Sequence, residues 1–437
     1  MAQPKNLVVL CDGTANQVSL YSHTNLVRLA RCLDKQASAD KRQMVFYDPG
    51  LGTEGSPAAL TWLGRQVTKL LGLMFGYGLS KNIADAYGFL MENYEPGDRI
   101  FIFGFSRGAY TARALVGLLE RVGLLEKGCE SLIHYAIKYY HQGNGHQLNF
   151  FKQRFSRTYS LKWGEVGIED DKHKDRPSKG VIPVHFLGVW DTVKSVGILR
   201  WQVILPDTNW LPNMVNGRHA VAIDEKRSQY RPLLWDSDTN DKHEEQEDLR
   251  KSNFQTCLHQ DVQTEWFSGV HADVGGGYGL PARLEKKQHK IKTEIKAIEW
   301  DLLPQYRKKG EDKLVDECLT KKRVLNEQLE QIETRELKET ALAYVSLQWM
   351  LEAADKHGLL LDSVEVTRNP LTLTPDAKLH NPLLPFWWIL GWWKRKLPEG
   401  AIVHTEGLTQ PAVTEAPKVE IVIKAKSVDA GHEEKQP

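Results

Sequence analysis

The chain has few cysteines and no closely spaced pair of them. Its five cysteines stand at positions 11, 32, 129, 257 and 318, and no C-x-x-C sequence occurs. A disulfide framework or a cysteine-based zinc site needs shorter and more regular spacing. We therefore predict neither, and we expect the protein to work in a reducing compartment.

The sequence also lacks a hydrophobic N-terminal segment long enough to direct secretion. Its first apolar run, at residues 7–11, is followed directly by Asp12, whereas the apolar core of a signal peptide has about 7–15 residues flanked by other signals. We expect a protein that is cytoplasmic as synthesised. If it acts outside its cell, it must leave by a route that uses no cleaved signal.

An excess of charge of either sign is absent as well. The 57 Lys and Arg residues balance 56 Asp and Glu residues, which leaves a net charge of +1. Domains that bind nucleic acids carry a marked basic excess. We therefore expect no nucleic-acid partner.

What is present is the pattern of a globular α/β protein. Of the 437 residues, 41% are apolar and 26% are charged, which suits a soluble protein with a large core. Apolar, β-rich runs alternate with amphipathic helical segments, and this alternation predicts a mostly parallel sheet with helices on both faces. We predict strands at 6–14, 43–50, 99–104, 181–191 and 264–271, and helices at 24–35, 78–94 and 107–122.

Residues 284–340 differ from that pattern. Large apolar residues recur there at helical spacing among many charges, and they include Leu284, Ile291, Ile295 and Ile298. A similar pattern follows the sequence PQYRKKGED. These features indicate two charged amphipathic helices that form an antiparallel hairpin. The hairpin is either a solvated insertion or a lid or docking element, and a further helix is predicted at 339–358.

The C-terminal part of the chain combines an aromatic run with a polar tail. The run Phe386–Lys396 holds four tryptophans and ends in three basic residues. It is too short to span a bilayer, but its composition is typical of a membrane–water interface. Peripheral membrane contact and packing against the domain both account for it. The tail, residues 403–437, is expected to be largely disordered, with one short strand candidate at 419–426.

The sequence GFSRG at 104–108 carries the main chemical signal. It places Ser106 between a predicted strand and a predicted helix, as in the nucleophile elbow of α/β-hydrolases. In such an elbow a tight turn exposes the serine hydroxyl, and only tiny residues fit two positions before and after it. Gly104 and Gly108 stand at those positions. A structural turn that merely contains a serine is the alternative.

A reactive serine needs a base, and the base needs an acid that orients it. In this fold the chain order is serine, acid, histidine, with the later residues placed after later strands. Asp191 ends the apolar run at 181–191, and His271 is followed by the glycine-rich sequence at 275–277. We therefore predict Ser106, Asp191 and His271 as the catalytic residues.

Other side chains compete for these roles. Asp48 follows a strand that precedes the serine, and Asp273 lies too close to His271 in the chain to orient its ring. His185 lies within a predicted strand. His219 precedes a helical-looking stretch, and it could instead line the pocket.

The negative oxygen that forms during ester cleavage needs two N–H donors. We predict the backbone N–H of Arg107, the residue after the serine, as the first. Gly13 or Thr14, in the loop after the first strand, is predicted to supply the second. Asp12 in the same loop is interpreted as a turn former.

Several segments together resemble one known family. In chain order they are VVLCDGTAN, FYDPGLGT, NIADAYGFL, GDRIFIFGFSRGAYTAR, FLGVWDTV, HAVAIDEKR, VHADVGGGY and SLQWMLEAA. They resemble the DUF2235 family, the α/β-hydrolase domain of phospholipase effectors delivered by bacterial type VI secretion. The resemblance covers roughly residues 5–280 and 340–360, and we expect the α/β-hydrolase domain to comprise residues 1–283 and 341–402. Residues 284–340 interrupt the family pattern.

The resemblance also implies a function. The family's triad falls on Ser106, Asp191 and His271, and the family's chemistry is the hydrolysis of carboxylic esters without a metal or other cofactor. Secreted members imply phospholipid substrates, a secretion-apparatus partner, an immunity protein and export by a type VI system. We therefore expect a serine hydrolase that cleaves lipid acyl esters through an acyl-enzyme. A soluble esterase for small esters and a non-catalytic binding or delivery module are the alternatives.

Overall fold

The structure of the protein is a computed structural model. It describes residues 4–13, 23–35, 42–50, 66–142, 145–157, 182–193, 205, 208–209, 211, 213–235, 261–368, 377–380, 395, 397, 401–404 and 420–422. Two predicted features lie outside these residues. They are Thr14 and, apart from Arg395, the aromatic run Phe386–Lys396.

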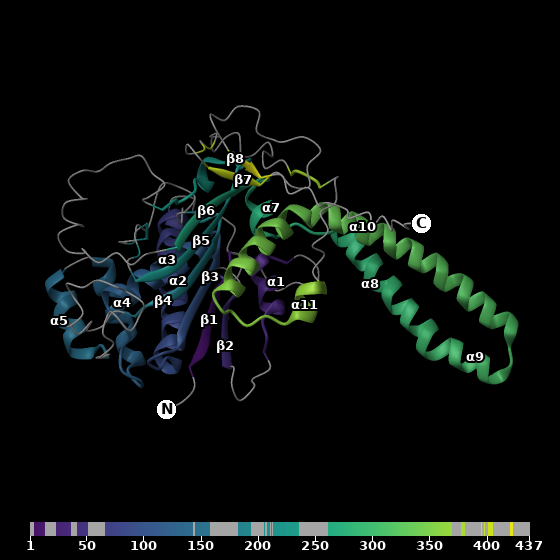
Figure 1. The fold of residues 1–437 in the computed structure, drawn as a ribbon, viewed down its shortest axis with the longest axis horizontal. Helices are drawn as coiled ribbons and strands as arrows, with labels where there is room; N and C mark the ends of the chain where they lie inside the picture. The colour runs from purple at the N-terminus through teal and green to yellow at the C-terminus, as the bar shows by residue number, and fades with distance from the viewer. Residues whose placement is uncertain are drawn as a thin grey trace, which may run out of the picture.

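An eight-stranded sheet runs through the described residues (Figure 1). Its strands are β1 (Lys5–Cys11), β2 (Arg42–Asp48), β3 (Arg99–Phe105), β4 (Val184–Trp190), β5 (Met214–Ala222), β6 (Asp261–Phe267), β7 (Ile402–His404) and β8 (Glu420–Val422). Their spatial order is β2-β1-β3-β4-β5-β6-β7-β8, and all neighbours pair in parallel. The predicted α/β class is confirmed, and the fold is α/β-hydrolase-like.

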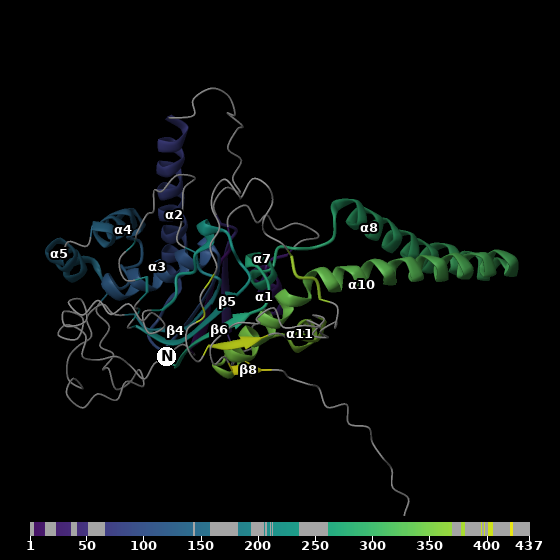
Figure 2. The same cartoon turned by 90° about the horizontal axis from the view of Figure 1, so that it is seen from above.

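Helices cover both faces of the sheet (Figures 1 and 2). One face packs against α2 (Gln66–Asn93), α3 (Arg107–Arg121), α4 (Ile133–Gln142) and α5 (Gly145–Phe155), and the other against α1 (Asn25–Cys32), α11 (Ser363–Arg368) and the C-terminal part of α10 (Asp312–Lys356). Strand β1 shows the reason. Leu7 and Val9 join the first core, whereas Val8 and Leu10 join the second. Since successive side chains of a strand point to opposite faces, a strand buried on both faces is apolar throughout.

A helical hairpin projects from the sheet domain (Figures 1 and 2). The short α7 (His271–Gly275) leads to α8 (Ala282–Ala297), a π-helical turn (Ile298–Leu302), α9 (Leu303–Lys309) and the returning α10. The hairpin has a small core of its own, formed by Leu280, Ile291, Ile295, Ile298, Leu303, Leu325 and Ile332. This core includes five of the apolar positions that the helical spacing predicted, namely Ile291, Ile295, Ile298, Leu325 and Ile332.

Helix α10 corrects one prediction. It is continuous over 45 residues, so the second arm of the hairpin and the helix predicted separately at 339–358 are one element. The sequence from 312 to 356 contains no glycine or proline that could end a helix. The predicted boundary at residue 340 therefore falls inside a helix.

Strand β5 was missed by the sequence analysis. His219 lies within this strand and not before a helix, because its polar neighbours are satisfied by adjacent strands. Asn216 donates to the carbonyl of His185 at 2.8 Å, and Arg218 pairs with Asp261 at 2.6 Å. Because these partners are distant in the sequence, the polar residues of 214–222 do not by themselves indicate a strand.

The C-terminal edge of the sheet also differs from the prediction. β7 and β8 include residues of the stretch that was expected to be a largely disordered tail from 403, and β8 lies within the strand candidate at 419–426. The other residues of that tail lie outside the described part. Strand β6 ends at Phe267, earlier than predicted, and helices α4 and α5 and the short 3-10 helices Glu130–Leu132 and Ser228–Tyr230 were not predicted.

Candidate active site

The predicted site residues meet at the edge formed by the carboxyl ends of the parallel strands. Ser106 follows β3, Asp191 follows β4, and His271 lies just beyond β6. The chain places β2 and β3 on opposite sides of β1, so the order of the strands reverses between β1 and β3. Open α/β sheets bind their ligands outside such a switch point. The topology therefore puts Ser106 at the position where this kind of sheet receives a ligand.

The backbone at Ser106 forms a strained turn. Ser106 has a φ of 60°, a left-handed value that non-glycine residues seldom adopt. Its N–H donates to the carbonyl of Trp190 at 3.0 Å, which ties the turn to the end of β4. A Cβ atom at Gly104 would lie 2.5 Å from the Cα atom of Ala109, and one at Gly108 would lie 2.1 Å from the carbonyl oxygen of Cys11. Only glycine fits at either position.

A hydrogen-bond chain links the three predicted residues. Nδ1 of His271 lies 2.6 Å from Oδ2 of Asp191, and Nε2 of His271 lies 2.7 Å from Oγ of Ser106. An ionised carboxylate only accepts hydrogen bonds, so Nδ1 carries the proton and Nε2 is left to accept from the serine hydroxyl. This is the tautomer in which the imidazole can take the serine proton.

Asp191 is completely buried and has several donors. In addition to His271, the N–H of Ala222 donates to it at 3.0 Å. Arg395 binds it with both terminal nitrogens, at 2.5 and 3.0 Å. Burial alone would raise the pKa of Asp191, but the charge of Arg395 and the hydrogen bond from His271 hold it well below its usual range. The carboxylate therefore stays ionised at neutral pH.

His271 is fixed by aromatic rings on two sides. Phe105 stacks on it with centroids 4.7 Å apart, and Tyr230 meets it edge-on at 4.7 Å. Its backbone N–H donates to Oε2 of Glu225 at 3.2 Å. A Cβ atom at Gly275 would lie 1.8 Å from the ring of Phe105, so this glycine lets the ring reach the imidazole.

Of the predicted oxyanion donors, Arg107 lies where it was expected, whereas the N–H of Gly13 already has a hydrogen-bond partner. Arg107 begins α3, directly after Ser106. The N–H of Gly13 donates at 2.6 Å to Oδ1 of Asp12, whose other oxygen accepts from Thr24 and Tyr47. Gly13 thus directs its N–H to Asp12 in this structure.

The competing side chains have other partners. Asp48 accepts from the N–H of Gly50 at the end of β2, and burial raises its pKa to about 6. Asp273 is bound by His380 at 2.6 Å. His185 contacts the carbonyl of His357 at 2.9 Å, and His219 accepts from the N–H of Thr192 at 3.2 Å. The structure brings none of the four into hydrogen-bond contact with Ser106.

Arg395 is the functional candidate that sequence reasoning missed. It was counted among the basic residues of the run Phe386–Lys396, for which membrane contact was considered. Its side chain instead binds Asp191 and the carbonyls of Ala222 and Tyr230, and the residue is only 5% exposed. A lone arginine about 200 positions after Asp191 gives no sequence signal of this contact.

The described residues contain neither a metal-binding cluster nor a membrane-spanning helix. No group of three or more His, Cys, Asp and Glu side chains among them could hold a metal ion. No described helix has the length and hydropathy of a membrane span.

Comparisons with known proteins place the chain among its relatives. The model of the family described as T6SS, Phospholipase effector Tle1-like, catalytic domain, matches residues 5–297. The uncharacterized protein YEL023C of Saccharomyces cerevisiae is 35% identical over 247 residues, which are 53% of this chain and 33% of that protein. The chain therefore spans about a third of the length of this curated relative.

Two solved structures show a distant likeness. One is an uncharacterized protein from Pseudomonas aeruginosa, with a TM-score of 0.37, 17% identity, and coverage of 87% of this chain and 48% of that one. The other is the Tle1 effector bound to the VgrG spike of the type 6 secretion system, with a TM-score of 0.34, 13% identity, and coverage of 89% and 78%. The family model matches well over half of the chain, including Ser106, Asp191 and His271. The resemblance to DUF2235 is confirmed: the chain belongs to the family of Tle1-like phospholipase effector catalytic domains of type VI secretion.

Proposed function

We propose that the protein hydrolyses acyl esters of lipids, with Ser106 as nucleophile, His271 as general base and Asp191 as the acid that orients the base. The observation that carries the proposal is the unbroken hydrogen-bond chain from Ser106 through His271 to Asp191, with links of 2.7 and 2.6 Å. Membership in a phospholipase effector family supports a lipid-hydrolase function.

The reaction proceeds in two steps through an acyl-enzyme. Oγ of Ser106 attacks the ester carbonyl carbon while its proton passes to Nε2 of His271. The tetrahedral oxyanion collapses, the bond to the alcohol oxygen breaks, and His271 returns the proton to that oxygen. Water then attacks the acyl-enzyme with His271 again as base, and the fatty acid leaves while the serine is regenerated.

The oxyanion is stabilised at the start of α3. The N–H of Arg107 is the first donor, and the positive end of this 15-residue helix favours the developing charge. The second donor comes from the loop after β1. Either Gly13 exchanges its bond to Asp12 for one to the oxyanion, or Thr14 supplies the N–H.

Arg395 acts on Asp191 as a positioning residue. Its two contacts hold the carboxylate beside His271, and they keep it ionised in a fully buried place. Part of the negative charge of Asp191 is thus offset by Arg395 and does not stabilise the imidazolium of His271. Arg395 therefore affects the basicity of His271 as well as the position of Asp191.

Phospholipids are the substrate class that the family favours, and export by a type VI system with a secretion-apparatus partner and an immunity protein belongs to the same proposal. The aligned yeast protein shows that related sequences occur outside bacteria. Hydrolysis and export are therefore separate parts of the proposal, and each needs its own test.

Labelling with a fluorophosphonate probe tests the nucleophile. The full-length protein is expected to be labelled, and Ser106→Ala is expected to lose both labelling and hydrolysis. Lipids extracted from phosphatidylcholine vesicles treated with either protein show whether fatty acid and lysophospholipid are released. Labelling that persists in Ser106→Ala excludes Ser106 as the nucleophile. Turnover of short soluble esters without release of fatty acid from vesicles identifies a small-ester esterase instead.

A further inference from the structure

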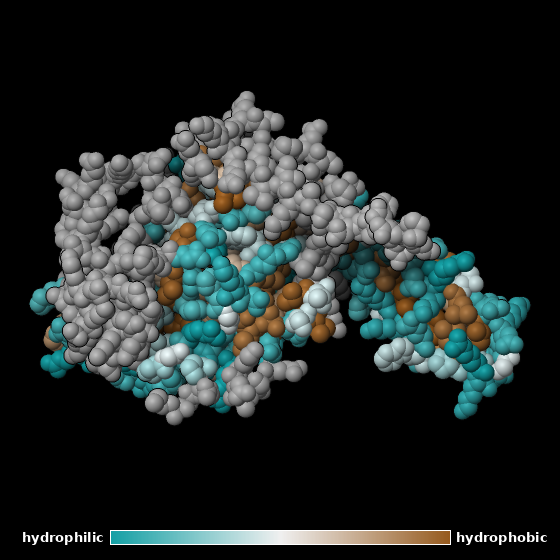
Figure 3. All heavy atoms as spheres, in the orientation of Figure 1, coloured by the Kyte–Doolittle hydropathy of each residue, from teal (hydrophilic) through white to brown (hydrophobic). Residues whose placement is uncertain are grey.

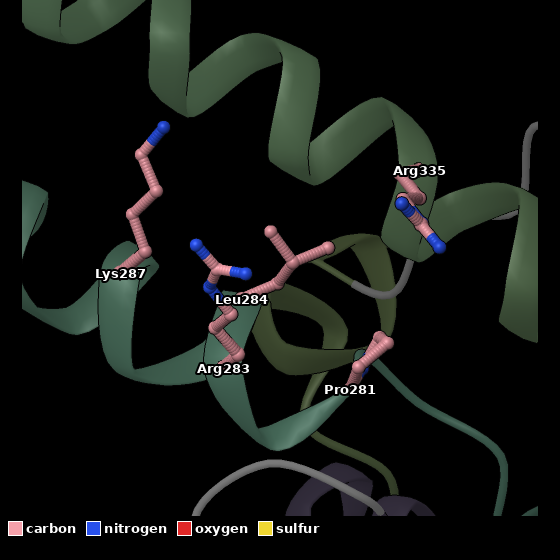
Figure 4. A pocket seen from close by; sticks show the side chains of 5 residues that line it. All are labelled: Pro281, Arg283, Leu284, Lys287 and Arg335. Atoms are coloured by element: carbon pink, nitrogen blue, oxygen red, sulfur yellow. The ribbon is translucent and has the colours of Figure 1, made fainter.

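The base of the helical hairpin contains a cavity that the proposed chemistry does not use. Its volume is about 550 Å³, and it lies between the first turns of α8 and the facing part of α10. Pro281, Arg283, Leu284, Lys287 and Arg335 line it (Figure 4). Arg283 and Lys287 extend from α8 towards α10, which carries Arg335. Three cationic side chains thus share one small space.

Two of these three cations lack an ion pair within the described part of the chain, although Glu285 and Glu336 lie on the same two helices. These two cations are Arg283 and Lys287. Arg335 has one distant contact, 3.9 Å from Glu339. Glu339 is already bound by Lys378 at 2.8 Å and by His380 at 2.9 Å. An anion in the cavity would give Arg283 and Lys287 a partner of opposite charge.

The start of α8 adds to this preference. The helix begins at Ala282 and has 16 residues, and Pro281, Arg283 and Leu284 at its start line the cavity, so the positive end of the helix lies beside it. Guanidinium groups bind phosphate in a bidentate manner, and an ammonium adds a point charge. The chemistry of the lining is therefore that of a phosphate site.

The size and the apolar part of the lining indicate more than a free ion. A cavity of about 550 Å³ falls within the range that holds whole small molecules, about 300–1,000 Å³. Pro281 and Leu284 give it an apolar wall beside the charges. A phosphate ester with its glycerol carbons matches such a lining better than inorganic phosphate does.

The cavity is connected to the helix that begins with His271. Glu339, which contacts Arg335, accepts from Nε2 of His380, and Nδ1 of His380 lies 2.6 Å from Oδ1 of Asp273. Asp273 belongs to α7, two residues after His271. A ligand in the cavity is thus held beside the element that carries the proposed base.

We propose that this cavity binds the phosphate group of an anionic phospholipid, and thereby holds the enzyme on the membrane that contains its substrate. The proposal rests on the lipid-hydrolase function proposed above. The base of the hairpin would then bind the membrane lipid, while Ser106, His271 and Asp191 carry out the reaction.

Vesicle binding by the full chain tests the proposal. All proteins carry Ser106→Ala, so that the lipids stay intact. Sedimentation is compared for vesicles of phosphatidylcholine alone and of equal parts phosphatidylcholine and phosphatidylglycerol. The cavity variant combines Arg283→Gln, Lys287→Gln and Arg335→Gln. The matched control combines Lys286→Gln, Lys290→Gln and Lys296→Gln, which removes the same charge from exposed positions of α8.

The cavity variant is expected to bind the anionic vesicles about a hundredfold more weakly, which is a factor of about five for each of the three cations that line the cavity and contact the lipid phosphate. The control is expected to lose much less, because its three lysines do not line the cavity. Glycerol 1-phosphate is expected to release the protein with the unaltered cavity from anionic vesicles. Sodium chloride at the same ionic strength is expected to release much less of it. Equal losses in the two variants mean general surface charge and overturn the proposal. If the cavity binds inorganic phosphate but the protein shows no preference for anionic vesicles, the ligand is free phosphate, and the proposed binding of a phospholipid is wrong.

Two further measurements separate the possible failures. With Ser106 restored, fluorophosphonate labelling of the cavity variant at the wild-type rate shows that its fold is intact. If labelling is slower, Lys287→Gln alone replaces the triple variant, with an expected loss of about fivefold. Vesicle binding through the cavity without lipid hydrolysis would contradict the proposed function alone. Hydrolysis that the cavity variant retains, with unchanged vesicle binding, would contradict this inference alone.

Discussion

The site at the carboxyl ends of the strands, called the sheet edge below, is formed by residues far apart in the chain, whereas the helical hairpin is formed by neighbouring helices. At the sheet edge, Ser106, Asp191 and His271 come from three strands, and 165 positions separate the serine from the histidine that it contacts. In the hairpin, the apolar contacts form between two neighbouring helices around a small core of their own. The sheet edge depends on the whole fold, whereas the hairpin depends on local periodicity. A change at the edge should therefore affect the chemistry, whereas a change in the hairpin core should leave the chemistry unchanged.

The largest expected effect comes from the acid of the proposed triad. Asp191→Asn keeps the shape of the side chain, but its amide can donate to Nδ1 of His271 and so favour the wrong tautomer. We expect kcat for ester hydrolysis to fall by about 10⁴-fold, as for the same change in serine proteases. Steady-state kinetics on a soluble ester measure this. A loss of less than tenfold would mean that Asp191 does not orient the base.

Removing Arg395 tests the next link at the same edge. Arg395→Met leaves the buried carboxylate of Asp191 without its cation, and breaking a buried pair costs about 3–5 kcal/mol of unfolding free energy. Arg395→Lys keeps the charge and loses the bidentate geometry, so it should retain part of the stability. Urea unfolding at pH 7 measures both variants. Equal stability of Arg395→Met and wild type would show that the pair contributes nothing.

The same pair predicts a dependence on pH. The pKa of Asp191 is depressed in the folded protein, so its stabilising contribution is complete above the unfolded-state pKa of about 4. It is lost as the pH falls through the lower folded-state value. Since Arg395 lowers that value, the folded-state pKa of Asp191 should lie higher in Arg395→Met, so this variant should lose less unfolding free energy as the pH falls, and its loss should be complete at a higher pH. Urea unfolding between pH 7 and pH 3 tests the direction, and a larger acid-induced loss in Arg395→Met than in wild type would contradict it.

The sequence predicted these two regions to different degrees. Ser106 was predicted from a strand, two glycines and a helix, and Asp191 and His271 were predicted from chain order, because each signal is local or set by the fold. The contact with Arg395 depends on packing between distant segments, and no local pattern encodes it. Strand β5 was missed for the same reason, since its polar residues are satisfied only by neighbouring strands. The hairpin core was predicted from spacing alone, but the continuity of α10 was not.

The hairpin core supplies the fourth prediction. Ile298 is 1% exposed within that core, and Ile298→Ala should destabilise the hairpin by about 2–4 kcal/mol. Thr293→Ala, an exposed position of α8, the helix that leads into the turn containing Ile298, is the matched control. Hydrogen exchange should become faster in α8 and in the distal part of α10, and fluorophosphonate labelling of Ser106 should stay unchanged. Slower labelling would show that the hairpin and the sheet edge are coupled.

The smallest expected effect concerns Trp300, which is 77% exposed in the π-helical turn of the hairpin. The hydrophilic surface of the hairpin carries apolar areas (Figure 3), and its exposed large apolar residues are Trp300, Leu314, Leu319 and Val324. Because an exposed ring buries little area on folding, Trp300→Ser should change the unfolding free energy by less than about 0.5 kcal/mol. It should also leave hydrolysis of a soluble ester unchanged. Thermal unfolding and steady-state kinetics measure both. A larger loss of stability would mean that Trp300 packs against something in solution, and the hairpin could then no longer be regarded as an element held together by its local contacts alone.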